Sequence, residues 1–465
     1  MNHRPSPSGS LHRSGSRRLF LGTGCACVAG TLVTLGCERT REPEAAPPTT
    51  PSLSTSLIPL RVWVAAPIAD QQIWLRQWLA HSEQPLELRS FSTAELLQQP
   101  QNDCDVLLYP ARLIGELTER GWIIKLPETV QAENGAEAEE QSNSSVPAAW
   151  RQQAIYAGQT MAIPLGCALP VFITSDSGPT AQQPLSWEEA LEALQIEEQA
   201  APQLDFDAGE VDREALVDRF LAIVATLSSR DPSYGLLFDL QTMQSRLTED
   251  NFVRAAKILA GLATQPLGVD SVIGSHSAAW QWAATTDRPA MAIAAPALLD
   301  PEMAQITTGQ IVRFRSATAV GQRPKVVAWN SGGGLLVSLS NQCRQSSHAA
   351  ALLRWLAEPN SRTVLSKFAM GIEASAPTSG VDSLAWRARQ SLADVMSGVG
   401  VAQEPRLPLA SLYRSTLADE LIAFLSGKKG VQQSVQAAHQ GWGQITAKAG
   451  QVQRRNYEQS LGLTL

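Results

Sequence analysis

The chain has 465 residues, a net charge of −7 at pH 7 and 44% hydrophobic residues. Its length exceeds what one ordinary core organises, so we expect two globular parts. The acidic balance excludes nucleic acid as a partner, because phosphates require a surplus of lysine and arginine.

The N-terminal segment begins with a basic stretch and continues into an apolar run, residues 19–35, that carries no charge. A membrane-spanning helix needs roughly twenty apolar residues, and this run is shorter. A basic leader, an apolar middle and small residues before a cleavage point are typical of an export signal. An uncleaved anchor helix is the alternative.

Two motifs within this segment resemble known bacterial signals. The sequence "SRRLFL" at 16–21 resembles the twin-arginine export motif, although Gly22 stands where lysine is usual. "TLGC" at 34–37 resembles a lipobox, with Thr34 in place of the usual leucine. The resemblance implies export to the periplasm or cell envelope and lipidation of Cys37, giving a membrane-tethered lipoprotein.

Cleavage before Cys37 would change the charge and the cysteine content. Residues 1–36 hold four arginines and no acid, so 33 basic and 44 acidic residues remain, a net charge of −11. Cys104, Cys167 and Cys343 are the thiols left in the body of the chain. Their scattered positions predict core packing, and a Cys104–Cys167 disulfide in an oxidising compartment is the alternative.

The expected body of the protein starts at residue 60. Residues 37–59 are rich in proline, serine and threonine, which predicts a flexible tether. From "LRVWV" to "RLIGELTERG", β-prone runs alternate with helical patterns, which predicts a parallel α/β sheet. Helices are expected over "DQQIWLRQWLAHSE" and after the capping boxes Ser92/Glu95 and Ser186/Glu189. The acidic stretch 131–149 predicts a disordered insertion.

The order of later features carries a family resemblance. After "DVLLYP" and "GELTERGWIIKLP" come "AIPLG", "SWEEALEAL", "MAIAAP", "GGGLLVSLS" and a helical end closing with "AAHQGWGQI". This order resembles the family 1 extracellular solute-binding proteins of ABC transporters, which include maltose and other sugar receptors. The resemblance implies an α/β fold of the periplasmic-binding-protein type II, with two lobes, a cleft between them, hinge closure and a helical C-terminal region.

The same resemblance sets the expected lobe boundaries and partners. We expect the first lobe to comprise residues 60–163 and 297–328, and the second lobe residues 164–296 and 329–465. The implied partners are a small polar solute, with a sugar favoured, and the subunits of an ABC permease.

Strand ends supply the candidate ligand-binding residues. Ligands bind beyond the carboxyl ends of parallel strands, where proline and glycine turns present backbone groups. The glycine run 332–334 is either a close backbone approach to the ligand or a hinge without ligand contact. Sugar rings stack on large aromatic planes, and the chain has 12 tryptophans, which favours Trp280 and Trp329 as stacking residues. Packing is the alternative role for both. The candidates are Pro67, Tyr109, Arg112, Gly166, Trp280, Pro296, Trp329, Asn330 and Gly333.

The sequence contains no recognised catalytic signature. Nucleophile-elbow, zinc-helix and phosphate-loop motifs are missing, and the histidines share no metal-ligand spacing. We therefore expect a binding protein with no catalytic residue, metal or cofactor. A sensory or scaffold lipoprotein and an exported carbohydrate hydrolase remain the alternatives, since two catalytic acids can lie far apart in sequence.

Overall fold

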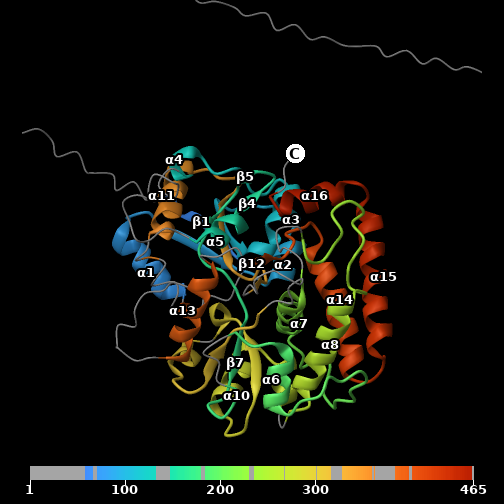
Figure 1. Ribbon diagram of the computed structural model, residues 1–465. Helices are drawn as coiled ribbons and strands as arrows, with labels where there is room; N and C mark the ends of the chain where they lie inside the picture. The colour runs from blue at the N-terminus through green and yellow to red at the C-terminus, as the bar shows by residue number, and fades with distance from the viewer. Residues whose placement is uncertain are drawn as a thin grey trace, which may run out of the picture. The chain divides into compact units, whose positions relative to one another are not determined.

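A computed structural model describes most of the chain after the N-terminal region. The described residues are 58–65, 71–131, 147–179, 184–229, 235–265, 268–299, 301–315, 327–358, 361, 383–396 and 401–462 (Figure 1). All of them belong to one compact unit, Ser56–Leu465. Within these ranges no helix combines the length and the apolar character needed to cross a membrane. The expected signal, Cys37, Pro67 and nearly all of the tether and of the 131–149 insertion lie outside them.

The first sheet has five strands in the order β2-β1-β3-β11-β6. Strands β1 (Leu60–Val64), β2 (Leu86–Ser90) and β3 (Val106–Pro110) are parallel, as expected. Strand β11 (Leu335–Leu339) runs antiparallel to both β3 and β6 (Ile163–Pro164), so the complete sheet is mixed and its parallel part is β1–β3. The reason is that β11 enters this sheet from the other half of the molecule, not through a local strand–helix–strand crossover.

The second half of the fold contains two smaller sheets. Strand β7 (Val171–Thr174) lies between β8 (Met291–Ala294) and β9 (Gln310–Val312), antiparallel to both. Strands β10 (Ala328–Asn330) and β12 (Val401–Gln403) form a parallel pair. A separate hairpin joins β4 (Ile155–Tyr156) to β5 (Gln159–Thr160).

Helices cover both halves. The shorter helices and turns in the first part of the chain are α1 (Gln71–His81), α2 (Thr93–Gln98), η1 (Ala111–Leu113), α3 (Ile114–Glu119), α4 (Glu128–Gln131), α5 (Ala148–Gln153) and α6 (Trp187–Leu194). The central helices are α7 (Arg213–Leu227), α8 (Asp250–Ala263), α9 (Gly268–Ile273), α10 (His276–Thr285), η5 (Pro296–Leu298) and η6 (Pro301–Gln305). The remaining helices are α11 (Ser346–Ala357), α13 (Leu384–Met396), α14 (Ala410–Leu425), α15 (Val431–Ala449) and α16 (Val452–Ser460).

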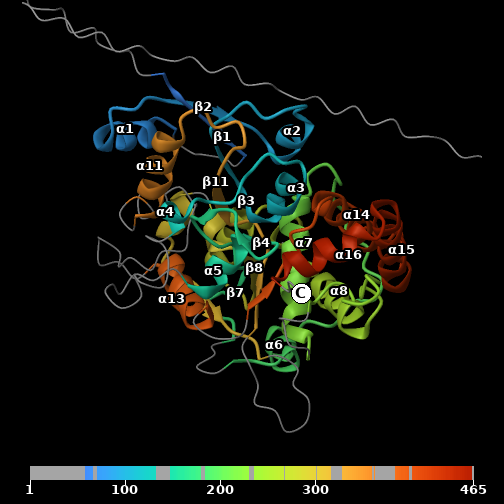
Figure 2. The same ribbon diagram turned by 90° about the horizontal axis from the view of Figure 1, so that it is seen from above.

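Local sequence signals placed several helices correctly. Ser92 caps α2 and Ser186 caps α6, and in each case the glutamate three residues later completes the capping box. The helical C-terminal region is confirmed as well, because α14, α15 and α16 follow one another and α14 and α15 pack on α7 and α8 (Figure 2).

Apolar burial is divided among distinct cores. One core joins α7, α8, α14 and α15, and another joins the first sheet to α1 and α11. Cys104 and Cys167 are unpaired and buried in two different cores, so the alternative of a disulfide between them is excluded. Burial raises the pKa of both thiols.

Strand pairing assigns two segments differently from the expected lobe boundaries. Strand β9 pairs with β7, so residues 310–312 lie with the second half of the fold, whereas they were expected in the first lobe. Strand β11 pairs with β3, so residues 335–339 lie in the first sheet, whereas they were expected in the second lobe. The chain returns to the first sheet through the glycine run that precedes β11. We use "first lobe" for the β2-β1-β3-β11-β6 sheet with its helices, and "second lobe" for the β8-β7-β9 and β10-β12 sheets with theirs.

Candidate functional site

Two chain segments cross side by side between the sheets. Residues 165–170 lead from β6 to β7, and residues 331–334 lead from β10 to β11. Ser331 N–H and its hydroxyl both donate to the Ala168 carbonyl, at 3.0 and 3.1 Å. Leu165 N–H donates to the Leu335 carbonyl at 2.9 Å. The two crossings are therefore held to each other by backbone.

This contact explains the glycine run. A Cβ on Gly334 would lie 2.5 Å from the Gly166 carbonyl oxygen and 2.7 Å from Cys167 Cα. Gly332 has φ +65°, a conformation that side chains disfavour, and its carbonyl accepts a 2.9 Å hydrogen bond from Arg112 N–H. Because backbone packs on backbone here, the close approach required by these glycines is to the protein itself.

Neutral amides surround the crossings. Asn330 Nδ2 donates to Gln403 Oε1 at 2.7 Å and to Gln153 Oε1 at 3.4 Å. Gln153 Nε2 in turn donates to the Gly166 carbonyl. All three side chains are buried. We call Gln153, Asn330 and Gln403 the amide network; it links both crossings to β12.

A charged cluster lies directly beyond the amide network. Arg414, on α14, donates to both Glu404 carboxylate oxygens at 2.9 Å, to Asp218 Oδ1 at 2.7 Å and to Glu214 Oε2 at 2.6 Å. Arg112 approaches the same Glu214 carboxylate, with 3.6 Å between Nη2 and Oε2. These residues, together with His276, form what we call the charged cluster.

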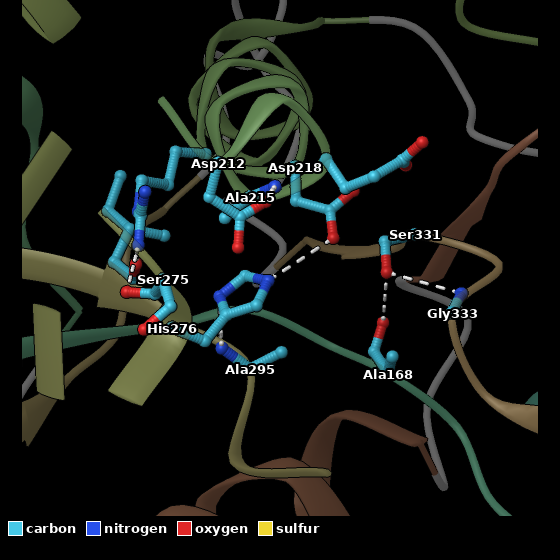
Figure 3. A network of polar contacts seen from close by, with 12 residues as sticks. Ala168, Asp212, Ala215, Asp218, Ser275, His276, Ala295, Ser331 and Gly333 are labelled. Atoms are coloured by element: carbon cyan, nitrogen blue, oxygen red, sulfur yellow. Dashed lines mark hydrogen bonds and ion pairs between the residues drawn. The ribbon is translucent and has the colours of Figure 1, made fainter. Parts of the chain in front are cut away.

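The two ring nitrogens of the histidine in this cluster face different groups. Ala295 N–H donates to His276 Nδ1 at 3.2 Å, so the ring proton of the neutral imidazole resides on Nε2. That nitrogen faces Asp218 Oδ2 at 3.4 Å, as Figure 3 shows. Ser331 hydrogen-bonds instead to Ala168 and Gly333. The Ser331 hydroxyl is therefore committed to backbone groups and not to the imidazole.

Burial and neighbouring charges give the three carboxyl groups different pKa values. Burial raises the pKa of Glu404 to about 7, although the Arg414 guanidinium opposes the change. Arg414 and His276 overcome the same burial effect at Asp218 and hold its pKa at about 2. The Arg112 and Arg414 guanidiniums likewise lower the pKa of Glu214. Glu404 is thus the carboxyl group of the cluster that titrates near neutral pH.

The crossings, the amide network and the charged cluster together form what we call the junction. Four of the predicted site residues lie there. Arg112 belongs to the charged cluster, Asn330 to the amide network, and Gly166 and Gly333 to the crossings. Their assignment to ligand contact stays a prediction, because each also has a structural partner here.

Other predicted site residues are buried in the interior. Trp280 is 0% and Trp329 1% exposed, and each lies within an apolar core, as the packing alternative expects; their stacking on a ligand stays a prediction. Tyr109 is also fully buried, and its hydroxyl hydrogen-bonds to Ser338 at 2.7 Å. Pro296 is buried as the first residue of η5.

Sequence reasoning missed most of the charged cluster. The sequence patterns assign no role to Glu214, Asp218, Glu404, Arg414 or His276. The available signal was the spacing of Glu214 and Asp218, which lie four residues apart and so share one face of α7. No local pattern links them to Arg414, which is about two hundred residues away. In the described ranges no group of three histidines, cysteines or carboxylates is arranged to hold a metal ion.

Comparison with known proteins identifies the fold. No protein-family model and no curated protein matches the chain. Among solved structures, an ABC-transporter solute-binding protein from Agrobacterium radiobacter in complex with ribitol superposes with a TM-score of 0.61 at 13% identity, covering 84% of this chain and 99% of that one. The chain has the fold of an ABC-transporter solute-binding protein.

Two further solute-binding proteins share this fold. The maltose/maltodextrin-binding domain from Bdellovibrio bacteriovorus, bound to maltotriose, gives a TM-score of 0.55 at 14% identity over 83% of this chain and 99% of that one. A solute-binding protein from Thermotoga lettingae, bound to α-D-tagatose, gives 0.56 at 14% identity with the same coverage. The two-lobe α/β architecture expected from the order of sequence features is confirmed.

Proposed function

We propose that this protein is an extracytoplasmic solute-binding lipoprotein that captures a small polar solute between its lobes and delivers it to an ABC permease. The observation that carries the proposal is the junction itself. Two crossing segments join the sheets, and ionisable side chains from both lobes converge beside them. Closure of two lobes around a solute needs connecting segments that can act as a hinge and side chains from both lobes that can contact the solute.

A carbohydrate or polyol is the favoured solute. Ribitol, maltotriose and tagatose are the ligands of three proteins that share the fold at low sequence identity. The junction supplies the carboxylates, guanidinium and amides that hydroxyl groups require. Because Trp280 and Trp329 are buried, recognition would depend on hydrogen bonds more than on these rings.

The leader supports the proposed location. The twin-arginine-like and lipobox-like motifs around Arg17 and Cys37 agree with export and lipid tethering. A solute receptor acts on the outer face of the membrane, where a tether keeps it close to its permease.

A thermal-shift screen tests solute capture. Sugars, polyols and charged small metabolites are added to the purified chain, and the melting temperature is followed by tryptophan fluorescence. A true solute at 100 times its Kd stabilises the folded state by about 2.7 kcal/mol. The solute should also compact the protein in small-angle scattering. If no compound in the panel does either, the proposal fails.

A matched pair of variants tests whether the solute binds at the junction. Glu214 and Glu189 both lie in the first turn of a helix, both pair with an arginine, and their side chains are 50% and 51% exposed. Glu214→Ala should weaken solute binding at least tenfold, whereas Glu189→Ala should leave it unchanged. Equal affinities for the two variants would place the solute elsewhere.

A further inference from the structure

The side chain of Arg112 extends from the first lobe to the second. Arg112 lies in η1, directly after β3, and its backbone N–H is fixed to the Gly332 carbonyl at 2.9 Å. Its guanidinium reaches Glu214 on α7, which packs against β10 of the second lobe. We propose that the Arg112–Glu214 pair is a latch that holds the two lobes closed before any solute binds. This inference rests on the proposed function only for its use in transport.

Charge complementarity supports the latch. On the second lobe, Glu214, Asp218 and Glu404 all pair with the guanidinium of Arg414. His276 is adjacent but has its Nδ1 committed to Ala295. Three carboxyl groups of the second lobe therefore share the Arg414 guanidinium, and Glu214 can accept a second cation. Arg112 is the cation that the first lobe presents to it, so closure brings opposite charges together.

The exposure of the pair makes it reversible. The side chains of Asp218, Glu404 and Arg414 are at most 5% exposed, whereas Glu214 is 50% and Arg112 11% exposed. Water and salt can therefore reach the pair without unfolding the second lobe. Arg414 also donates to the Glu214 carboxylate at 2.6 Å and to the Glu214 backbone carbonyl at 2.9 Å. The acceptor is thus already positioned when the Arg112 guanidinium arrives.

The latch sets the closed fraction of the solute-free protein. A partly exposed ion pair shifts an equilibrium by about two- to fivefold, and added salt screens it. Removing the Arg112 charge should change the ratio of closed to open molecules by that factor. High salt should produce the same change in the native protein and little further change in the variant.

The test compares the full chain with Arg112→Gln, without solute, by small-angle scattering and hydrogen exchange at 0.02 and 1 M salt. Arg315→Gln is the matched control, because Arg315 pairs with Glu189 inside the second lobe at 2.9 Å. At low salt, Arg112→Gln should have the larger radius of gyration and faster exchange in peptides covering 111–117 and 213–221. Arg315→Gln should match the native chain. Native scattering and exchange that are identical to those of Arg112→Gln at low salt would overturn the latch.

Two additional measurements keep the outcome clear. Glu214→Gln removes the other partner and should open the lobes to the same extent, and Arg112→Lys should restore part of the closure. Circular dichroism confirms that each variant is folded. Because none of these measurements uses a solute, the latch can fail while the thermal-shift screen succeeds, and the reverse also holds.

Discussion

The amide network and the charged cluster are neighbours that handle buried polarity in opposite ways. Asn330 connects Gln153 with Gln403 through neutral hydrogen bonds, and the next residue after Gln403 is Glu404, which enters an ionic contact with Arg414. Glu404 N–H also donates to the Asn330 carbonyl at 3.0 Å, so the two regions share backbone.

The difference assigns each region a physical task. Neutral amides respond to neither salt nor pH, so they suit the crossings, where geometry must persist while the lobes move. Charged groups respond to both, so they suit the surface where the lobes meet. The predictions below test that division, from the largest expected effect to the smallest.

Removing Arg414 should have the largest effect. Arg414→Met leaves Glu404 and Asp218 buried without their cation, and breaking a buried ion pair costs about 3–5 kcal/mol. Urea unfolding measures the loss. Arg213→Met is the control, since Arg213 pairs with Asp419 at the surface with side chains 47% and 57% exposed. Losses of similar size for both variants would show that the cluster does not behave as a buried ionic unit.

Adding one methyl group at the crossings should have the next largest effect. Gly334→Ala forces a Cβ against the Gly166 carbonyl, and overpacking of this kind costs about 2–3 kcal/mol. At Gly443, within α15, a Cβ would meet no other atom within 4 Å. Gly443→Ala should therefore stabilise the protein by about 0.5–1 kcal/mol, as alanine does in a helix. Thermal unfolding of the two variants measures the expected loss and the expected gain of stability. A Gly334→Ala variant as stable as the native chain would disprove the backbone contact.

Glu404 should make stability depend on pH. Its folded pKa of about 7 lies above the ordinary value of 4.5, so its contribution is present at low pH and is lost as the pH rises from 4.5 through 7. Relative to the native chain, Glu404→Gln should gain about 2 kcal/mol of stability between pH 5 and pH 8.

Urea unfolding at both pH values measures this change. Asp218 has the opposite sign, since its lowered pKa makes its contribution disappear only as the pH falls from 3.8 through about 2. The pH range over which Asp218 changes stability does not overlap the range of Glu404. A difference between native chain and Glu404→Gln that is constant from pH 5 to 8 would contradict the raised pKa.

Disrupting the amide network should have the smallest effect and no pH dependence. Asn330→Ala removes the bonds to Gln403 and Gln153 and should cost about 1 kcal/mol. The cost should be equal at pH 5 and pH 8 and at low and high salt. Unfolding under these four conditions provides the measurement; a cost that varies with pH would mean that the network is coupled to Glu404.

Sequence patterns predicted the parts of this fold that depend on neighbours along the chain. The capping boxes at Ser92 and Ser186 are complete within four residues, and both are confirmed. The order of strands and helices likewise indicated two α/β lobes. The position of β11 was not predictable in this way, because its pairing with β3 joins residues more than two hundred positions apart.

The candidate site shows the same limit. Gly166, Gly333 and Asn330 were found because glycine runs and strand ends are visible in sequence. Glu214 and Glu404 were not found, since the contact that makes them notable runs through Arg414 on a distant helix. The excess of tryptophan suggested stacking on a ligand, but Trp280 and Trp329 are core residues, and composition alone does not distinguish these roles.

The separate burial of two thiols has a consequence for redox chemistry. Oxidation and thiol exchange require an accessible thiolate, and burial both shields Cys104 and Cys167 and keeps them protonated. Burial raises the pKa of Cys343 as well, but this side chain is only half-buried and is the most accessible of the three cysteines in the described ranges. In an oxidising medium the folded body would therefore keep two reduced sulfurs, and mixed disulfides with small thiols would form first at Cys343.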